Sequence, residues 1–227
     1  MKRFWKQVTV EPGNGIALDA RPVRTPGRAL LQLPTGQLAE AIAEEWRGVG
    51  ETLDPRTMPL TGLANAAIDR VAPDPARFAA GLTAYGESDL LYYRAESPPQ
   101  LIARQQAAWD PLLDWACGRY DVHFEPVHGV MHRAQPPATI TRLSEAVAAL
   151  DPFRLAGLSP LVTVSGSLIA ALALLEGAAD ADTAWNATRI DEDWQAEQWG
   201  EDDLAIATRD AHRADFDTGV RFLALLG

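Results

Sequence analysis

Polar and apolar residues alternate at the start of the chain, which is the pattern of β-strands with one buried face. Residues 4–10 follow a two-residue period, residues 11–15 supply turn-forming Pro, Gly and Asn, and residues 16–18 resume the extended pattern. Two such runs separated by a turn predict a β-hairpin. A third extended run is expected at residues 29–33, between turns rich in proline and glycine.

From residue 36 onward, apolar residues recur every three or four positions, which is typical of amphipathic helices. Thr35 precedes the first helix and is a residue type that caps helix N-termini. Residues 121–133 are expected to be extended or irregular, and residues 89–93 could form a strand or a helix end. The expected helices cover residues 38–49, 60–71, 76–85, a longer stretch after 98–99, residues 138–150, 161–175, 182–198 and a final stretch from 202.

The order of these elements predicts an α+β protein, with a small N-terminal antiparallel β-containing domain followed by a larger, mainly α-helical domain. The expected domains are residues 1–57, which hold the strands and one helix, and residues 58–227. A chain of 227 residues can bury a sizeable core without cross-links. In the final helix, Leu204, Ala207 and Ala211 begin an apolar stripe opposite a charged side, so we expect this helix to be docked on a core.

Residues 155–175 carry no charge over 21 positions, close to the ~20 residues that span a bilayer. Gly, Ser, Thr and Pro dilute the first half, and only residues 168–175 are strongly apolar, so we expect a buried helix and no membrane insertion. The first six residues resemble neither a signal peptide nor a transit peptide. Together with the single Cys117, this favours a reduced compartment, namely the bacterial cytoplasm, or the mitochondrial matrix if the source is eukaryotic.

The formal net charge of −11 is concentrated in one segment. Residues 176–217 contain 13 acidic residues and 3 arginines, a net of −10, whereas the first 28 residues carry a net of +4. A protein that neutralises phosphates needs a basic face, so the composition argues against a general nucleic-acid binder. A basic surface on a protein partner is the better expectation.

Motifs for known chemistry are largely absent from the sequence. It contains neither of the glycine-rich phosphate-binding motifs, and the serines near residue 165 lie in an apolar helical stretch rather than a nucleophile elbow. His123, His128 and His132 invite a zinc interpretation, but their segment does not look helical and no cysteine completes a site. We therefore expect no catalytic residues, no metal and no cofactor.

The sharpest local feature is the acidic run at residues 190–203, in which Trp194 and Trp199 are interleaved with carboxylates. The carboxylates could form a solvated helix face or serve acid and base catalysis, although no nucleophile accompanies them. The tryptophans could cap the core or anchor a protein partner inside an acidic rim. The other tryptophans lie on or beside apolar stripes and are expected in the core: Trp5, Trp46, Trp109, Trp115 and Trp185.

Several blocks of residues follow one another along the chain. They are Arg3-Phe-Trp-Lys6, residues 18–26, the stretch 38–46 ending in Glu-Glu-Trp, Met58-Pro-Leu-Thr61 with Ile68-Asp69, Asp89-Leu-Leu-Tyr-Tyr93, residues 106–113, Gly166-Ser-Leu168, Asp191-Glu-Asp-Trp-Gln195 and Trp199-Gly-Glu-Asp202. No single block is specific, but their order extends across nearly the whole chain. Read as ordered blocks, the sequence resembles the ATP12 family, assembly chaperones for the F1 sector of ATP synthase. It departs mildly from the family pattern, which usually has Gly where Ala20 stands, Lys where Arg24 stands, and Gln where the stretch 48–50 follows the Glu-Trp block.

The resemblance implies a two-domain protein without catalysis of its own that binds the unassembled F1 α subunit until the β subunit replaces it. We expect a monomer whose acidic helix supplies part of the α-subunit contact. Carboxylates would steer the partner and tryptophan would anchor it. Two alternatives stay open: a small-molecule enzyme that uses residues 191–203, or a scaffold for another basic protein. The expected contact residues are Glu192, Asp193, Gln195, Trp199 and Glu201.

Overall fold

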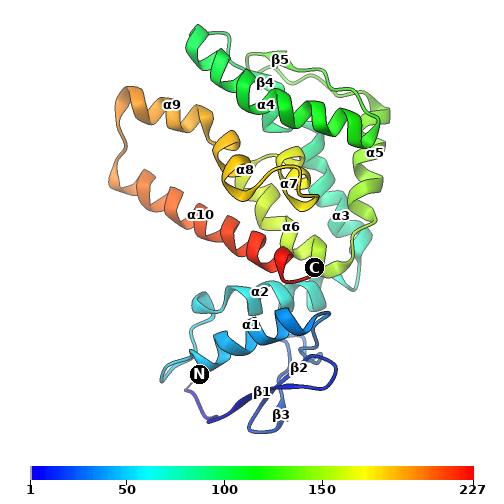
Figure 1. Ribbon diagram of the computed structural model, residues 1–227, viewed down its shortest axis with the longest axis vertical. Helices are drawn as coiled ribbons and strands as arrows, with labels where there is room; N and C mark the ends of the chain where they lie inside the picture. The colour runs from blue at the N-terminus through cyan, green and yellow to red at the C-terminus, as the bar shows by residue number, and fades with distance from the viewer. Residues whose placement is uncertain (1) are drawn as a thin grey trace. The chain divides into compact units, whose positions relative to one another are not determined.

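A computed structural model describes residues 2–227. Its contacts divide the chain into two compact units. Unit 1 comprises Met1–Pro75, Asp151–Gly157 and Thr218–Gly227, and unit 2 comprises Ala76–Leu150 and Leu158–Asp217. Small strands lie near the N-terminus and helices make up most of the rest, so the α+β class expected from the sequence is confirmed (Figure 1). The expected division into domains at residue 57 stays a prediction.

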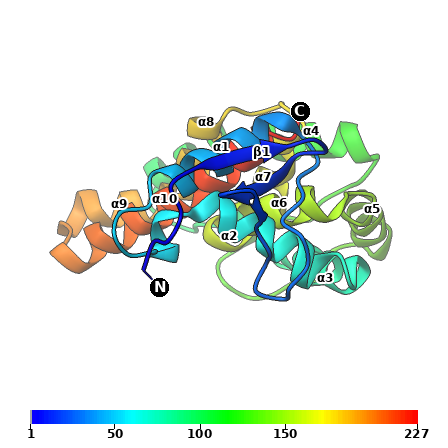
Figure 2. The same ribbon diagram turned by 90° about the horizontal axis from the view of Figure 1, so that it is seen from below.

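Unit 1 contains an antiparallel sheet in the order β1-β2-β3, formed by β1 (Val8–Glu11), β2 (Gly15–Leu18) and β3 (Arg21–Pro22). The sheet lies against helix α1 (Gly36–Arg47), as the views in Figures 1 and 2 both show. The predicted hairpin is confirmed, with Val8 opposite Leu18. The extended run at 29–33 forms only isolated bridges, which pair Gln32 with Gly15 and Leu30 with Arg24.

The turn between β2 and β3 places two consecutive residues in the left-handed backbone region. Asp19 has φ 47° and Ala20 has φ 64°. The Asp19 carboxylate accepts hydrogen bonds from the backbone N–H groups of Gln7 and Lys6, which also hold the pKa of this carboxyl below its usual value. Ala20 has no such compensation, and a residue with a Cβ is strained in this conformation. The backbone of this turn therefore favours glycine at position 20, as in the family pattern.

Two carboxylates fix the start of α2 (Pro59–Ala66) and the loop that precedes α1. Glu45 of α1 accepts hydrogen bonds from the backbone N–H groups of Leu60 and Thr61 and from the Thr61 hydroxyl, at 2.7 to 2.8 Å. Asp69 accepts from the Thr25 hydroxyl and from the Gly27 backbone N–H, both at 2.7 Å. These residues belong to blocks that the resemblance singled out, and their role here is to join segments of unit 1.

The predicted cap and the aromatic core of unit 1 are both present. The Thr35 hydroxyl accepts a hydrogen bond from the Leu38 backbone N–H at the start of α1 and donates one to the Leu225 carbonyl. Trp5 and Trp46 are both buried, and their ring centroids lie 5.4 Å apart. The N-terminal segment is thereby held against α1 by aromatic packing.

Unit 2 is built around α7 (Leu168–Leu175). Its residues 168–173 are all at most 2% exposed, and it packs against α4 (Pro99–Tyr120) and α8 (Ala181–Thr188). Two short parallel strands, β4 (Tyr93–Arg94) and β5 (Val127–His128), lie beside α4. The α-helices that follow α2 along the chain are α3 (Pro75–Thr83), α4 (Pro99–Tyr120), α5 (Pro137–Ala148), α6 (Pro152–Ser165), α7 (Leu168–Leu175), α8 (Ala181–Thr188), α9 (Ile190–Trp199) and α10 (Asp203–Ala224).

No helix within residues 2–227 is long and apolar enough to cross a membrane.

Two helices that the sequence pattern presents as continuous are broken in the structure. The expected helix at 161–175 is wrong because Gly166, with φ 68°, ends α6, and Ser167 then caps α7. The expected helix at 182–198 is wrong because the backbone of Arg189 leaves the helical region between α8 and α9. Apolar periodicity alone does not reveal a break of one or two residues when the period resumes on the same face.

A buried carboxyl group holds the start of α7. Asp89 is fully buried and accepts hydrogen bonds from the backbone N–H groups of Leu91 and Ile169, at 3.1 and 2.9 Å. Burial raises the pKa of Asp89 to about 6, against the opposing effect of these N–H donors. The side chain thus links the 3₁₀ turn at Leu90–Tyr92 to the central helix.

Candidate partner-binding site

The expected contact residues lie on α9 and on the short connection to α10. Gly200, with φ 81°, ends α9, and the Asp202 carboxylate accepts a hydrogen bond from the Ala205 backbone N–H at the start of α10. Helix α9 and residues 203–217 of α10 belong to unit 2. Only Gly200, Glu201 and Asp202 separate them, so the acidic run is displayed on a pair of connected helices (Figure 1).

Helix α9 is fastened to α4 by polar side chains. The buried amide of Gln105 donates a hydrogen bond to Asp191 Oδ1 at 2.6 Å. Arg104 donates to Glu197 Oε1 at 2.8 Å, and its guanidinium carbon lies 4.9 Å from the ring centroid of Trp194. Trp194 is half-buried as a result. These contacts anchor one side of α9 and leave its other side, with Trp199, facing outward.

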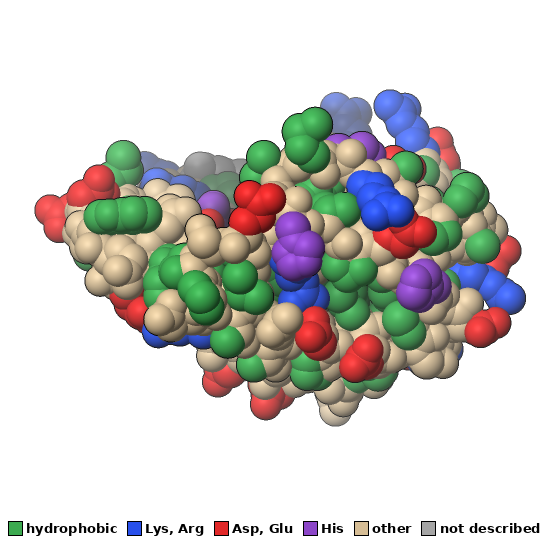
Figure 3. Space-filling view, turned by 90° about the horizontal axis from the view of Figure 1, so that it is seen from above, with side chains coloured by type: hydrophobic (Ala, Val, Ile, Leu, Met, Phe, Trp, Pro, Cys, Tyr) green, Lys and Arg blue, Asp and Glu red, His purple; other side chains and the backbone are tan. Residues whose placement is uncertain are grey.

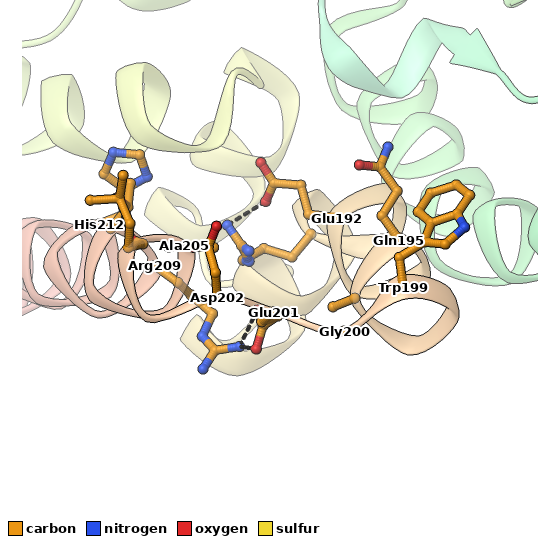
Figure 4. Close-up of a pocket in the computed structure, with 13 residues that line it drawn as sticks. Glu192, Gln195, Trp199, Gly200, Glu201, Asp202, Ala205, Arg209 and His212 are labelled. Carbon is orange, nitrogen blue, oxygen red and sulfur yellow. Dashed lines mark hydrogen bonds and ion pairs between the residues drawn. The ribbon is translucent and has the colours of Figure 1, made fainter.

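A hollow of about 520 Å³ lies between α9 and the start of α10, and we call it the α9–α10 hollow (Figure 4). Four of the five expected contact residues line it, namely Glu192, Gln195, Trp199 and Glu201. Asp193 is exposed but is not among the lining residues. The structure therefore gathers most of the expected residues at one place. The others that line the hollow are Arg189, Ala196, Gly200, Asp202, Leu204, Ala205, Thr208, Arg209 and His212.

Two carboxylates at this hollow form ion pairs with arginines of the same chain, drawn as dashed lines in Figure 4. Glu192 pairs with Arg189, and both carboxylate oxygens of Glu201 lie 2.7 Å from Nη1 of Arg209. The first pair joins Arg189, at the N-cap of α9, to Glu192 three residues further on. The second joins residues on two sides of a helix break, and helical spacing does not reveal it.

These ion pairs leave a surplus of negative charge around the hollow. Residues 189–209 contain seven acidic residues and two arginines, a net charge of −5. Glu192 is the exposed member of its pair, so a cation of a partner can approach that carboxylate. The arrangement favours the approach of a basic surface.

Large apolar side chains are exposed beside these carboxylates. Trp199 is 80% exposed and Leu204 is 76% exposed, and both line the α9–α10 hollow. On the face that carries α4 and α9, hydrophobic and acidic side chains lie next to one another (Figure 3). Exposed apolar side chains grouped within a charged rim mark a surface for protein contacts.

The expectation that α10 is docked on a core along its whole length is wrong. Leu204, Ala207 and Ala211, which begin its apolar stripe, are all exposed, whereas Phe216 and Phe222 are 1% and 0% exposed. Only the second half of α10 is buried, because residues distant in sequence pack on that half alone. Leu204 is thus a candidate contact residue that the sequence analysis assigned to the core.

The histidines do not gather into a metal site. Within residues 2–227, no group of three or more His, Cys, Asp or Glu side chains is arranged to hold a metal ion. His123, His128 and His132 are exposed, and Nδ1 of His132 lies 3.1 Å from the Tyr93 hydroxyl. Burial raises the pKa of the Cys117 thiol, which makes it a poorer nucleophile. Trp5, Trp46, Trp109 and Trp185 are core residues as expected, and Trp115 is half-buried.

The family model of the ATP12 chaperone protein matches residues 2–117, which is about half of the chain. The chain belongs to the ATP12 family, as the resemblance indicates. The homologues support a role as an assembly chaperone of ATP synthase.

Solved structures extend the similarity over the whole chain, including α9 and α10. The crystal structure of Atp12 from Paracoccus denitrificans is 46% identical, with a TM-score of 0.93, and covers 100% of this chain and 98% of that one. The Atu1473 protein of Agrobacterium tumefaciens is 40% identical with a TM-score of 0.93, over 100% of this chain and 86% of that one. The mitochondrial protein atp12 of Schizosaccharomyces pombe is 25% identical in an alignment of 229 positions that covers 94% of this chain and 77% of that protein.

Proposed function

We propose that this protein binds the unassembled α subunit of the F1 sector of ATP synthase and keeps it from aggregating until the β subunit takes its place. The observation that carries the proposal is the similarity to Atp12 of Paracoccus denitrificans over the full length of both chains. We further propose that it acts as a monomer where F1 is assembled, in a bacterial cytoplasm or a mitochondrial matrix.

The physical basis is the surface that a subunit of a stable complex exposes before assembly. Such an interface resembles half of a hydrophobic core, and it aggregates when it is left uncovered. A chaperone must cover part of that surface and yet release it. Its contacts should therefore combine charge steering, which speeds association, with a few aromatic anchors of moderate strength. Trp199 and the surplus carboxylates of α9 meet this requirement.

The direct test is an aggregation assay with purified F1 α subunit. Light scattering of the α subunit at assembly temperature should fall when this protein is added in equimolar amount, without nucleotide, and should stay low when β subunit displaces it. An unchanged scattering curve, together with no co-purification of the two proteins, would contradict the proposal. A small ligand that raised the melting temperature would instead favour the enzyme alternative.

A second experiment tests the placement of the contact on α9. The double variant Glu192→Gln/Glu201→Gln removes two charges at the α9–α10 hollow and should weaken α-subunit binding most at low salt. The matched control is Asp210→Asn/Asp215→Asn, which removes two exposed charges of α10 that do not line the hollow. Equal binding by both double variants would contradict this placement and leave the chaperone function standing.

A further inference from the structure

A second and larger hollow lies on the other side of α9. It has a volume of about 1000 Å³, and we call it the α4–α9 hollow. Its walls are the first turns of α4, one face of α9, residues 95–98 after β4, and Gly129 and Val130 after β5. Gln195 and Trp199 line both hollows, so α9 is a ridge between them and the exposed indole of Trp199 belongs to both.

The walls of the α4–α9 hollow are largely apolar. The apolar side chains of Leu90, Pro98 and Leu101 line the hollow, and α9 adds the ring of Trp194. Val130 stands at the rim and is 91% exposed. Single exposed apolar residues are common on protein surfaces, but Val130 extends the apolar lining of this hollow out to the surface. The hollow therefore offers apolar contact area that no segment within residues 2–227 covers.

A buried arginine also lines this hollow. Arg94 is 6% exposed, its Nη2 donates to Asp110 Oδ1 at 2.7 Å, and its guanidinium lies over the Trp109 ring, 5.0 Å from the centroid. Its Nε and Nη1 are buried and have no hydrogen-bond partner among the described residues. A buried donor without an acceptor costs about 1–3 kcal/mol. Arg94 is therefore a buried cation held by Asp110 and by the Trp109 ring.

The charge at the rim restricts the class of occupant. Glu96 and Asp191 line the hollow, and α9 contributes the surplus carboxylates described above. The only cation among the lining residues is Arg94, which is already paired with Asp110. An apolar floor within an acidic rim fits an apolar segment with Lys or Arg on its flanks, and it disfavours an acidic ligand.

We propose that the α4–α9 hollow is the apolar receptor of the docking surface and takes a short apolar segment, flanked by basic residues, of the unassembled F1 α subunit. This inference rests on the proposed function and names the surface at which the partner binds. The partner lies across α9, with the apolar segment on the α4 side, Trp199 against its middle, and the charged contacts on the α10 side.

The test compares two neighbouring exposed residues. Val130→Asp places a charge at the rim of the hollow, whereas Met131→Asp places one at a residue that is 80% exposed and does not line it. Both variants should melt at the temperature of the unaltered protein. We expect Val130→Asp to weaken binding of purified F1 α subunit about tenfold or more and Met131→Asp to change it less than about twofold.

A charge reversal at one position tests the basic flanks. Gln198 is exposed and lines only the α4–α9 hollow. Gln198→Lys should weaken α-subunit binding, and Gln198→Glu should leave it unchanged or strengthen it. Gln106→Lys, an exposed α4 residue that does not line the hollow, serves as the control.

The outcomes separate this inference from the proposed function. If the unaltered protein binds α subunit and Val130→Asp binds equally well, or if both aspartate variants lose binding alike, the α4–α9 hollow is not the receptor and the chaperone function stands. Equal binding by the two Gln198 variants would contradict the proposal that basic residues flank the bound segment. If the unaltered protein does not bind α subunit, the proposed function and this inference both fail.

Discussion

Gln105 of α4 and Asp191 of α9 are joined by a hydrogen bond of 2.6 Å that spans 86 positions of the sequence. The same Gln105 side chain accepts a hydrogen bond from the Ala95 backbone N–H at 2.8 Å. One buried amide therefore fixes the position of α9 and of residues 95–98, which are two walls of the α4–α9 hollow. Gln105 itself lines the hollow, so one side chain both borders the proposed docking surface and holds two of its walls in place.

Replacing this amide should loosen the fold and the surface together. Gln105→Leu leaves the Ala95 N–H and the Asp191 carboxylate without their partner, so we expect the free energy of unfolding to fall by about 1–3 kcal/mol. Urea denaturation measures this change. The adjacent exposed residue provides the control, since Gln106→Leu should stay within about 0.5 kcal/mol of the unaltered protein. A neutral Gln105→Leu would show that the two bonds contribute no net stability.

The two tryptophans of α9 should separate binding from stability. Trp199→Ala removes a side chain that is 80% exposed, so the free energy of unfolding should change by less than about 0.5 kcal/mol while α-subunit binding weakens about tenfold or more. Trp194→Ala removes the half-buried ring under Arg104 and should cost about 1–2 kcal/mol of stability. Thermal unfolding and a binding titration on both variants decide the matter. A Trp199→Ala variant that unfolds more easily and binds normally would reverse the assignment.

The carboxylate that caps α2 should matter more than its neighbour on α1. Glu45→Gln places an amide donor against one of the N–H groups of Leu60 and Thr61, and we expect a loss of about 1–3 kcal/mol in the free energy of unfolding. Glu44→Gln removes only an exposed pair with Arg47, worth about 0–1 kcal/mol. Equal effects of the two substitutions in denaturation experiments would argue against the capping role.

The strained turn offers a stabilising substitution. Ala20→Gly relieves a residue held at φ 64°, and we expect it to raise the free energy of unfolding by about 1 kcal/mol despite the larger entropy of the unfolded chain. Ala29, which is exposed and has no positive φ, provides the comparison, because Ala29→Gly should destabilise. Calorimetric melting of both variants tests the sign, and a lower melting temperature for Ala20→Gly would contradict the strain.

Asp89 should give the stability a recognisable dependence on pH. Its pKa is raised from 3.8 to about 6 in the folded protein, so the folded state holds the proton more tightly than the unfolded state. The stability that proton binding by Asp89 adds to the folded state is fully present below pH ~4 and is lost as the pH rises through ~6. A difference of two pKa units corresponds to about 3 kcal/mol. Asp89→Asn cannot titrate. The stability of the unaltered protein relative to this variant should therefore fall between pH 4 and pH 7 in denaturation curves, and a constant difference would exclude the raised pKa.

Much of the secondary structure could be predicted because its causes are local. Thr35 caps α1 through the N–H of Leu38, three residues away, and the hairpin at β1 and β2 follows from alternation around a turn. The breaks at Gly166 and Arg189 were missed because the apolar period continues across them. The same limit explains why Leu204 was assigned to a core that reaches only the second half of α10.

The sequence by itself determined the α+β class, the helical periodicity, the family, and the location of the negative charge with its tryptophans, since each is a property of residues near one another along the chain. Only the tertiary structure decided which sides of α9 and α10 are covered, how Arg209 meets Glu201, and that Val130 stands beside Trp194 and Trp199 at one hollow. Exposure depends on which distant segments pack together, and helical spacing is the same for a stripe that faces a core and for one that faces a partner.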